Sequence, residues 1–526
     1  MNPRVTPRTA FSYGQIISVA LLQSIFTALV VVSNASLWID EFGTWKLSQA
    51  ADLHEWWRQI RHWSGSDTQF PLYHFYMYFW TDLFGDSEYI LRLSNVPLFF
   101  AAQVALLWPF RRERPMLTAL VVISSVYAFL WYYLNEARAY VMIYLGACIT
   151  LAAIVTIYRS KATSVSRLPL AAMWWLTTGI IILSASSLLG VPQALGALVF
   201  IAYVAISRDW HRKPVEVSYA LPLLILMIIL GVLGIYYLST LLAGARATKL
   251  YDTNLYSVGF AMYELAGLSG LGPSRLALRE HGINALVGHR VLIATGALAV
   301  MSTFAYGLRA LRGHDTASKS WGVAIACVAT PVFILMAAGY VMHWRVLGRH
   351  LMPLAPIIVV VLSYSCASSW AHRSLSRRLL VIGLGALLSF SAVETKLRQS
   401  VDKDDYRSAA AYAREALASG KVVWWVADSI GAEYYHVPLS AKNDPNSPLC
   451  PAQQRGQVVQ ACNMRPQCAE RPPMPEVAVL SKPDIHDTSG TVEHFLRSQA
   501  IYHPTELPAF HIYRRADQPV TGSPPR

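Results

Sequence analysis

The sequence predicts a polytopic α-helical membrane protein with a small α/β domain at its C-terminal end. Of its 526 residues, 54% are hydrophobic and only 14% are charged, whereas soluble domains carry about a quarter charged residues. Long apolar runs recur up to about residue 397, after which charged and polar residues return. The net charge of +13 falls in short basic clusters between the apolar runs, which argues against binding to nucleic acid.

Each apolar run has close to the ~20 residues that are needed to cross a bilayer core. We expect about eleven spans, of which the pair around 184–192 is the hardest to separate. The first run lacks a small-residue cleavage site, so it is predicted to be an uncleaved helix. The runs cover 14–33, 89–109, 116–134, 139–158, 168–186, 190–206, 217–240, 288–308, 321–341, 350–369 and 379–396.

Basic residues in alternate connecting segments predict the orientation. The set consists of Arg4, Arg8, Arg111, Arg112, Arg114, Arg159, Lys161, Arg167, Arg208, Arg212, Lys213, Arg309, Arg312, Lys319, Arg373, Arg377 and Arg378. Cytoplasmic loops carry the excess of Lys and Arg, so the N-terminus is predicted to be cytoplasmic. The loop 34–88, the segment 241–287 and the C-terminal tail are then expected outside.

The predicted domains are a membrane domain over 1–396 and an extracytoplasmic α/β domain over 397–526. In the second, Asp404 and Asp405 begin an amphipathic helix, where carboxylates favour the helix N-terminus. Apolar runs at 422–426 and 477–480 predict buried strands. A helix near 490–499 and a strand near 508–513 complete the unit, and 443–475 is expected to be a poorly fixed loop.

The six cysteines fall into two groups. Three lie in predicted spans, where they act as small apolar residues; these are Cys148, Cys327 and Cys366. The others lie in the outer loop, where any two of them can pair in an oxidising compartment and leave one thiol; these are Cys450, Cys462 and Cys468.

Two adjacent carboxylates, Asp40 and Glu41, follow the first span and open a polar, Trp-rich loop. Charged groups at a membrane surface are costly to desolvate, which indicates a functional role. Chemistry at the membrane–water boundary is therefore expected here. The alternative is that the pair only favours the N-terminus of a following helix through its dipole.

The rest of this loop is rich in aromatic and cationic residues. The stretch 53–63 predicts a helix lying in the interface, with Trp at headgroup depth and Arg near lipid phosphates. It is followed by Gln69, Phe70 and the run 71–76, and then by 83–94, which leads into the second span.

Several short motifs in this order resemble those of a known superfamily. They are W-x-D-E at 38–41, P-L-Y at 71–73, L-F-G-D-S-E-x-x-x-R-L-S at 83–94, N-E-A-R-A-Y at 135–140, G-R-H-L-M-P-L-A-P at 348–356 and D-D-Y-R-S-A-A-A-Y at 404–412. Together they resemble GT-C glycosyltransferases of the protein O-mannosyltransferase and lipid A aminoarabinose and galacturonosyl transferase group. The chain departs from that pattern at Gln69-Phe70, where many members have His-Pro, and at His350, where Tyr is common.

The resemblance implies an enzyme of the bacterial inner membrane with a periplasmic C-terminal domain. Its donor would be a sugar linked to a polyprenyl phosphate, and its acceptor an envelope lipid, glycan or protein. Transfer to a hydroxyl needs a base to take the acceptor's proton. Asp40 is the preferred candidate, with Glu41 as its support or alternate.

The leaving lipid phosphate needs cations to stabilise its developing charge. Arg138 and Arg349 are the best candidates and Arg345 and His343 weaker ones, with interfacial snorkelling as the alternative for each. Glu136 is expected to orient Arg138, or to join Asp40 around a divalent cation. Mg²⁺ or Mn²⁺ would suit such oxygen ligands, although the sequence does not demand a metal.

Four other residues are expected to support the site: Gln69, Tyr73, His74 and His350. Tyr73 and His74 are candidates to bind sugar or acceptor, and the alternative is the interfacial aromatic belt. The segment 241–287 is a candidate lid.

Two other functions remain open. A transporter or flippase for a lipid-linked solute would carry ionisable residues near the midplane in repeated halves, which the sequence lacks. A non-catalytic scaffold would leave the carboxylate and arginine clusters unexplained.

Overall fold

The chain folds into two compact units, each described by itself. In this computed structural model, the described residues are 10–63, 66–162, 170–207, 217–242, 254–275, 277–278, 282–312, 315–341, 346–371, 374–439, 458–460, 474–481, 486–487 and 491–516. The helical unit comprises Met1–Ser33 and Leu47–Arg398. The C-terminal unit comprises Asn34–Lys46 and Gln399–Arg526, so the segment that carries the carboxylate pair belongs to it.

The helical unit has the architecture of a multi-pass membrane protein. Eight of its described spans are long and apolar enough to cross a bilayer, namely Tyr13–Val31, Glu88–Phe110, Tyr140–Arg159, Ala220–Thr240, Gly282–Arg309, Gly322–Val341, Gly348–Ala371 and Leu375–Arg398. The pair Arg114–Ser125 and Ala128–Leu134, bent by 53°, makes a ninth if it is one span. Two shorter apolar helices, Leu170–Ser186 and Leu188–Tyr203, cover the remaining two predicted runs. The helical membrane class is confirmed, and the count of eleven stays a prediction.

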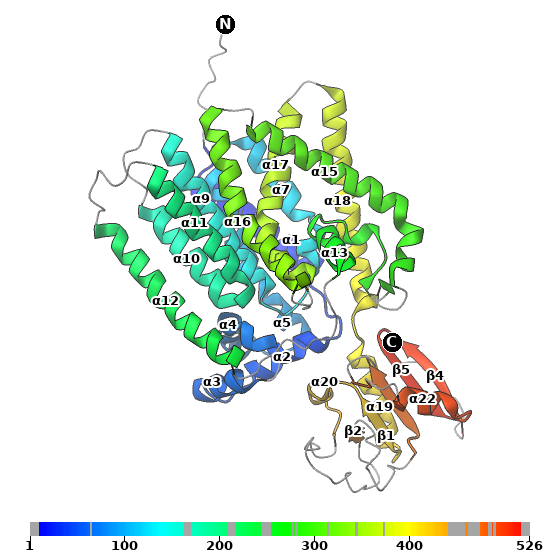
Figure 1. Ribbon diagram of the computed structural model, residues 1–526. Coiled ribbons are helices and arrows are strands. Elements are labelled where there is room, and N and C mark those ends of the chain that lie inside the picture. Colours follow the sequence, from blue (N-terminus) through cyan, green and yellow to red (C-terminus); the bar gives the residue numbers. More distant parts are fainter. Residues whose placement is uncertain are drawn as a thin grey trace. The chain divides into compact units, whose positions relative to one another are not determined.

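The membrane helices are joined by shorter elements (Figure 1). The first part contains α1 (Tyr13–Phe26), a π-helical turn (Thr27–Val31), α3 (Leu53–His62), η2 (Ser66–Gln69), α4 (Pro71–Phe84), α5 (Glu88–Leu93), α6 (Asn95–Leu107), η3 (Trp108–Phe110), α7 (Arg114–Ser125), α8 (Ala128–Leu134), α9 (Tyr140–Ala162) and α10 (Leu170–Ser186). The second contains η4 (Leu188–Gly190), α11 (Val191–Ser207), α12 (Val217–Leu242), α13 (Leu255–Leu265), η6 (Ser269–Leu271), η7 (Gly282–His289), α15 (Arg290–Arg312), α16 (Asp315–Val341), η8 (Gly348–Leu354), α17 (Ala355–Ala371) and α18 (Leu375–Asp402).

Helix α9 is the core of the helical unit. Its spanning stretch is 89% buried, against 22% for that of α12, and it packs against α6, α10 and α17 (Figure 1). Helices α9 and α10 approach closely at Gly146, where an added Cβ would lie 2.8 Å from the backbone nitrogen of Leu183. Small residues permit this kind of approach between membrane helices.

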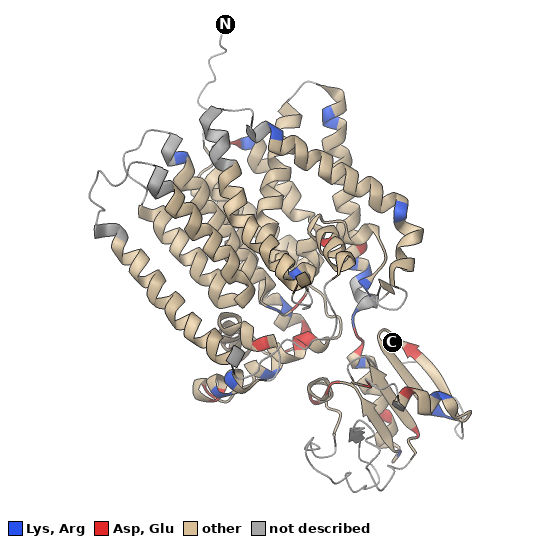
Figure 2. Ribbon diagram, in the orientation of Figure 1, with Lys and Arg blue, Asp and Glu red and all other residues tan. Residues whose placement is uncertain are grey.

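An arginine lies near each end of α9. Arg138 precedes the helix, and at its other end Arg159 forms an ion pair with Glu113 and donates to the carbonyl of Pro109. Lys and Arg occur toward both ends of the helical unit (Figure 2). The side of the membrane that each end faces stays a prediction.

The C-terminal unit contains a mixed five-stranded sheet in the order β2-β1-β3-β5-β4. Strands β2, β1 and β3 are parallel, and β5 and β4 complete the sheet in antiparallel pairing. The strands are β1 (Val423–Val426), β2 (Val458–Gln460), β3 (Val477–Ser481), β4 (Tyr502–Leu507) and β5 (Phe510–Arg515), and the helices are α2 (Ile39–Ser48), α19 (Tyr406–Ala418), α20 (Ser429–Tyr434) and α22 (Thr491–Ser498).

Both faces of this sheet are covered, which explains the continuous apolar run in β1. Trp424 packs in one cluster with Leu496 of α22. Trp425 points to the other face, where it meets Tyr406 of α19 at a ring-centroid distance of 6.4 Å. Successive strand residues face opposite sides, so a strand buried on both sides has no polar positions.

Most elements predicted for the tail are present. Asp405 is the N-cap of α19 and accepts a hydrogen bond from the backbone of Ser408 at 3.1 Å. Strands β1, β3 and β5 and helix α22 match the expected positions. The prediction missed α20 and β4, and it assigned β2 to a loop. The three cysteines of that loop lie outside the described residues.

Candidate functional site at one end of the helical unit

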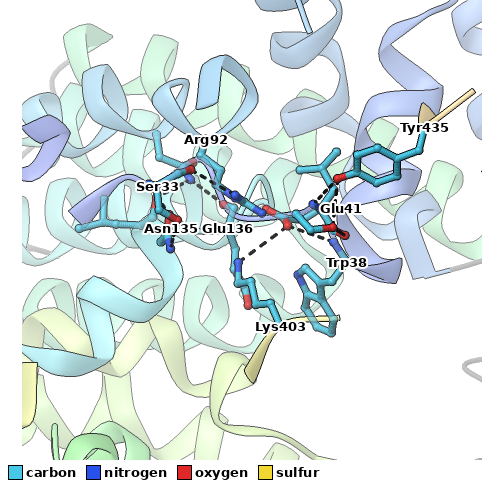
Figure 3. A network of polar contacts seen from close by, with 12 residues as sticks. Ser33, Trp38, Glu41, Arg92, Asn135, Glu136, Lys403 and Tyr435 are labelled. Carbon is cyan, nitrogen blue, oxygen red and sulfur yellow. Dashed lines mark hydrogen bonds and ion pairs between the residues drawn. The ribbon is translucent and has the colours of Figure 1, made fainter. Parts of the chain in front are cut away.

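Three chain segments that are far apart in sequence meet beside the start of α9. Ser33, at the end of the first span, donates from its backbone N–H and its hydroxyl to Asn135 Oδ1, at 2.9 and 3.0 Å. Arg92, which is fully buried, donates to the carbonyl of Ser33 at 3.2 Å (Figure 3). Asn95 donates to the carbonyl of Glu136 at 2.6 Å. These contacts join the motifs at 83–94 and 135–140.

Arg138 lies in a buried cluster with Asp67 and His74. Its guanidinium donates to Asp67 Oδ1 and lies 5.0 Å from the ring centroid of Phe70. His74 Nε2 lies 3.5 Å from the same carboxylate oxygen. Arg138 is 2% exposed and Asp67 is 7% exposed, so Arg138 does not snorkel toward a lipid surface. Its ion-pair partner is Asp67, which no sequence motif marks.

Electrostatics fix the protonation of this cluster. Burial alone would raise the pKa of Asp67, but Arg138 and His74 outweigh it and hold that pKa well below its usual range. Burial lowers the pKa of His74, although Asp67 opposes the change. At neutral pH the cluster therefore holds an ionised Asp67, a neutral His74 and a charged Arg138.

A second buried carboxylate, Glu264 of α13, accepts from Arg275 Nε at 2.7 Å. Arg275 also donates to the hydroxyl of Tyr133 at 2.9 Å and stacks over the ring of Tyr132, with its Cζ 3.7 Å from the centroid. Burial disfavours the charge of Arg275, but Glu264 together with Tyr132, Tyr133 and Glu136 outweighs it, and the pKa of the guanidinium is raised. Arg275 therefore stays protonated throughout the physiological range.

Arg349 of η8 belongs to this second cluster. It acts electrostatically on Glu264, which therefore has two arginines nearby. The preceding residue, Gly348, is required by the packing, because an added Cβ would lie 2.0 Å from Glu264 Oε2. The motif at 348–356 thus places an arginine and a small residue beside a buried carboxylate.

Glu136 and Lys396 add two further charged groups at this end of the helical unit. The buried Glu136 acts electrostatically on Arg275, Tyr132 and Tyr133. Lys396 of α18 donates to the carbonyl of Val31 and lies close enough to Arg92 to repel it. Among the described residues, the charged groups linked by these contacts are five cations (Arg92, Arg138, Arg275, Arg349 and Lys396) and three carboxylates (Asp67, Glu136 and Glu264). In this described set the cations outnumber the carboxylates.

The carboxylate pair belongs to the C-terminal unit and lies in a helix, where a loop was expected. Asp40 and Glu41 occupy the first turn of α2, a position that the helix dipole favours. Asp40 is half-buried and Glu41 is fully buried. Glu41 Oε2 lies 3.8 Å from Lys403 Nζ and accepts from the backbone N–H of Trp38 at 3.4 Å (Figure 3).

The other expected site residues fall into three groups. Tyr73 and His74 are buried (0% and 1% exposed), which does not fit an aromatic belt facing lipid. Gln69 accepts at its carbonyl from Tyr237 at 3.4 Å, and His350 Nδ1 accepts from the backbone of Leu347 at 3.0 Å. Arg345 and His343 lie outside the described residues, as do Tyr251, Asp252 and Thr253 of the proposed lid.

A metal site receives no structural support. Within the described ranges, no group of three or more His, Cys, Asp or Glu side chains is arranged to hold an ion. Asp40 and Glu136, the two candidate ligands, belong to different units. A requirement for Mg²⁺ or Mn²⁺ stays a prediction.

Five charged residues of the site were not predicted as site residues, although Arg92 lies in the motif at 83–94: Arg92, Asp67, Glu264, Arg275 and Lys396. Arg92 and Glu264 carried a usable signal, because each lies in an apolar stretch where an ionisable residue indicates a specific partner. Asp67 and Arg275 lie in polar connecting segments, where charged residues are common.

No family model and no curated protein matches the chain. The likeness to GT-C glycosyltransferases rests on the short motifs alone and stays a prediction.

Proposed function

We propose that the protein is an integral-membrane glycosyltransferase that uses a sugar linked to a polyprenyl phosphate. The acceptor would be an envelope lipid, glycan or protein on the outer face of the inner membrane. The observation that carries this proposal is the cluster of charged groups at this end of the helical unit, in which buried and partly buried cations outnumber the carboxylates among the described residues. A departing phosphate develops negative charge, and preorganised guanidinium groups in a site of low dielectric stabilise it.

The proposed reaction is a displacement at the anomeric carbon of the donor sugar. The acceptor oxygen forms a bond to that carbon while the bond to the phosphate oxygen breaks, and its electron pair leaves with the phosphate. The acceptor's hydroxyl proton passes to a base, for which Asp40 is the candidate. Arg138 and Arg349 are proposed to bind the phosphate, and Arg275 supports them through Glu264.

The distribution of charge favours this function over transport. Between Arg138 and Arg159, the sequence of α9 contains no Asp, Glu, Lys, Arg or His, so the core helix offers no charged group at mid-depth. Transporters commonly place such groups there.

The test measures sugar transfer by the purified full-length protein in nanodiscs, with a polyprenyl-phosphate sugar as donor. Mass spectrometry of membrane lipids, glycans and exported proteins, with and without the protein, identifies the acceptor by its added mass. We expect Asp40→Asn to lower turnover by ~100-fold or more, the usual contribution of a general base. Full transfer by that variant would remove Asp40 as the base. Solute uptake driven by an ion gradient in liposomes, without transfer, would replace the proposed function with transport.

A further inference from the structure

The segment 34–46 is built into the C-terminal unit by contacts along its whole length. At its start, the side chain of Arg407 donates to the carbonyl of Asn34 at 2.8 Å, and its backbone N–H donates to Ser36 Oγ at 3.2 Å. At its end, Lys46 forms an ion pair with Glu433 of α20. Both partners come from chain segments that follow the membrane helices in sequence.

The middle of the segment packs through aromatic rings. Phe42, fully buried, meets Tyr406 edge-on at a centroid distance of 4.8 Å. Helix α20 packs against the same ring at Gly431, where an added Cβ would lie 2.7 Å from Phe42. Trp45 meets Tyr434 edge-on at 5.0 Å. Edge-to-face pairs of this kind add to the energy of burial.

Two residues of the C-terminal unit make polar contacts with this segment, one at the backbone that precedes the carboxylate pair and one at Glu41 itself. The hydroxyl of Tyr435 accepts from the backbone N–H of Leu37 at 2.9 Å and lies 3.1 Å from Ser36 Oγ (Figure 3). Lys403 places its ammonium 3.8 Å from Glu41 Oε2, and both residues are almost fully buried (7% and 0% exposed). A buried carboxylate without a cation beside it would be strongly unfavourable.

We propose that Lys403 and Tyr435 are positioning residues for the carboxylate pair. Glu41 is their ionic anchor and does not accept the proton, and Asp40, its half-buried neighbour, keeps that role. The C-terminal unit therefore sets the conformation of the segment that carries the base. This inference rests on the proposed function only for its activity readout, because the structural effect is measurable without any reaction.

The structural test is hydrogen–deuterium exchange over 34–46 in the full-length protein in nanodiscs. Lys403→Met keeps the stem of the side chain and removes the ammonium that lies 3.8 Å from Glu41 Oε2. We expect exchange in this segment to accelerate about tenfold or more, because amide exchange reports local opening. Tyr435→Phe, which loses only the hydroxyl, should accelerate it by a smaller factor. The matched control is Arg497→Met, because Arg497 is an exposed cation of the same unit that pairs with Glu493; exchange over 34–46 should not change.

The double variant Glu41→Gln with Lys403→Met separates an ionic anchor from a general structural role. Since neither charge remains, protection of 34–46 should return toward the wild-type value. The proposal would be overturned if the double variant lost as much protection over 34–46 as the two single variants added together. It would also be overturned if Lys403→Met exchanged at the wild-type rate.

Activity adds the second readout. Lys403→Met should lower kcat with little change in KM for the donor, and Lys403→Arg should restore it. The double variant should recover turnover relative to Lys403→Met, which is impossible if Glu41 is the base. A double variant as inactive as Asp40→Asn would return the role of base to Glu41 and contradict the assignment. If the exchange results hold but the wild-type protein transfers no sugar, the proposed function fails and the positioning role stands.

Discussion

The ion pair between Asp67 and Arg138 provides a quantitative test of the site. Asp67→Asn removes the carboxylate charge and leaves the guanidinium of Arg138 buried, at 2% exposure. Solvent cannot screen that charge, so the expected loss is ~3–5 kcal/mol, as for other buried pairs that lose one partner. Unfolding entropy grows with chain length, and for a unit of this size the loss corresponds to a fall in Tm of about 4–7 °C.

The assay is thermal unfolding of the detergent-solubilised protein, followed by intrinsic tryptophan fluorescence. Adding Arg138→Gln to Asp67→Asn removes the uncompensated charge and should recover at least ~1.5 kcal/mol as coupling energy. The control is Glu55→Gln, which breaks a pair with the exposed Arg58; such surface pairs contribute about 0–1 kcal/mol. The idea of a stabilising buried pair would be refuted if the Tm of Asp67→Asn fell no further than that of the control. It would also be refuted if the double variant lost more stability than the two single variants added together.

Three further predictions concern the same end of the helical unit. Because burial lowers the pKa of His74 below its ordinary value of 6.5, the unfolded chain binds a proton more readily than the folded one, and stability is lost as pH falls through 6.5. The Tm of His74→Asn should therefore fall less between pH 7 and pH 5 than that of the wild type, and parallel curves would contradict this. Gly348→Ala should destabilise the fold by about 1–3 kcal/mol through its clash with Glu264. By contrast, Gly383→Ala, with open space around it, should be neutral or stabilising in a thermal scan. Arg275→Lys should lower the Tm and weaken binding of the polyprenyl-phosphate donor in a titration, because lysine cannot both pair with Glu264 and stack on Tyr132; unchanged donor affinity would remove Arg275 from the site.

The helices of the membrane unit were largely predictable because their signal is local. Each apolar run has a length set by the bilayer, and all eleven predicted runs coincide with apolar helices or helix pairs. The ambiguous stretch at 184–192 corresponds to the two shorter helices and the turn η4 between them. Elements in the tail were predictable for a similar reason, because β1 and β3 are continuous apolar runs. Strand β4 is mostly exposed, with burial only at its start, and it has no such signature.

The site was predictable only in part. Motifs marked Arg138, Arg349, Glu136 and the pair Asp40–Glu41, because each lies in a short sequence pattern that resembles the superfamily. The partners of these residues were not predictable, since Asp67 pairs with Arg138 across 71 residues and Glu264 with Arg275 across 11 residues, in segments that join the membrane helices. Pairing across such sequence distances depends on how the helices pack, which no local pattern encodes.

The sequence by itself determined the class of the protein, the order of its membrane segments and the presence of charge at their ends. These properties follow from the length and polarity of each apolar segment, because each segment must satisfy the requirements of the bilayer by itself. Only the tertiary structure decided which charges are paired, and that 34–46 is built into the C-terminal unit. The ion pair of Glu41 with Lys403 joins two positions that are separated in sequence by every membrane helix except the first, and a contact of that kind exists only once the chain has folded.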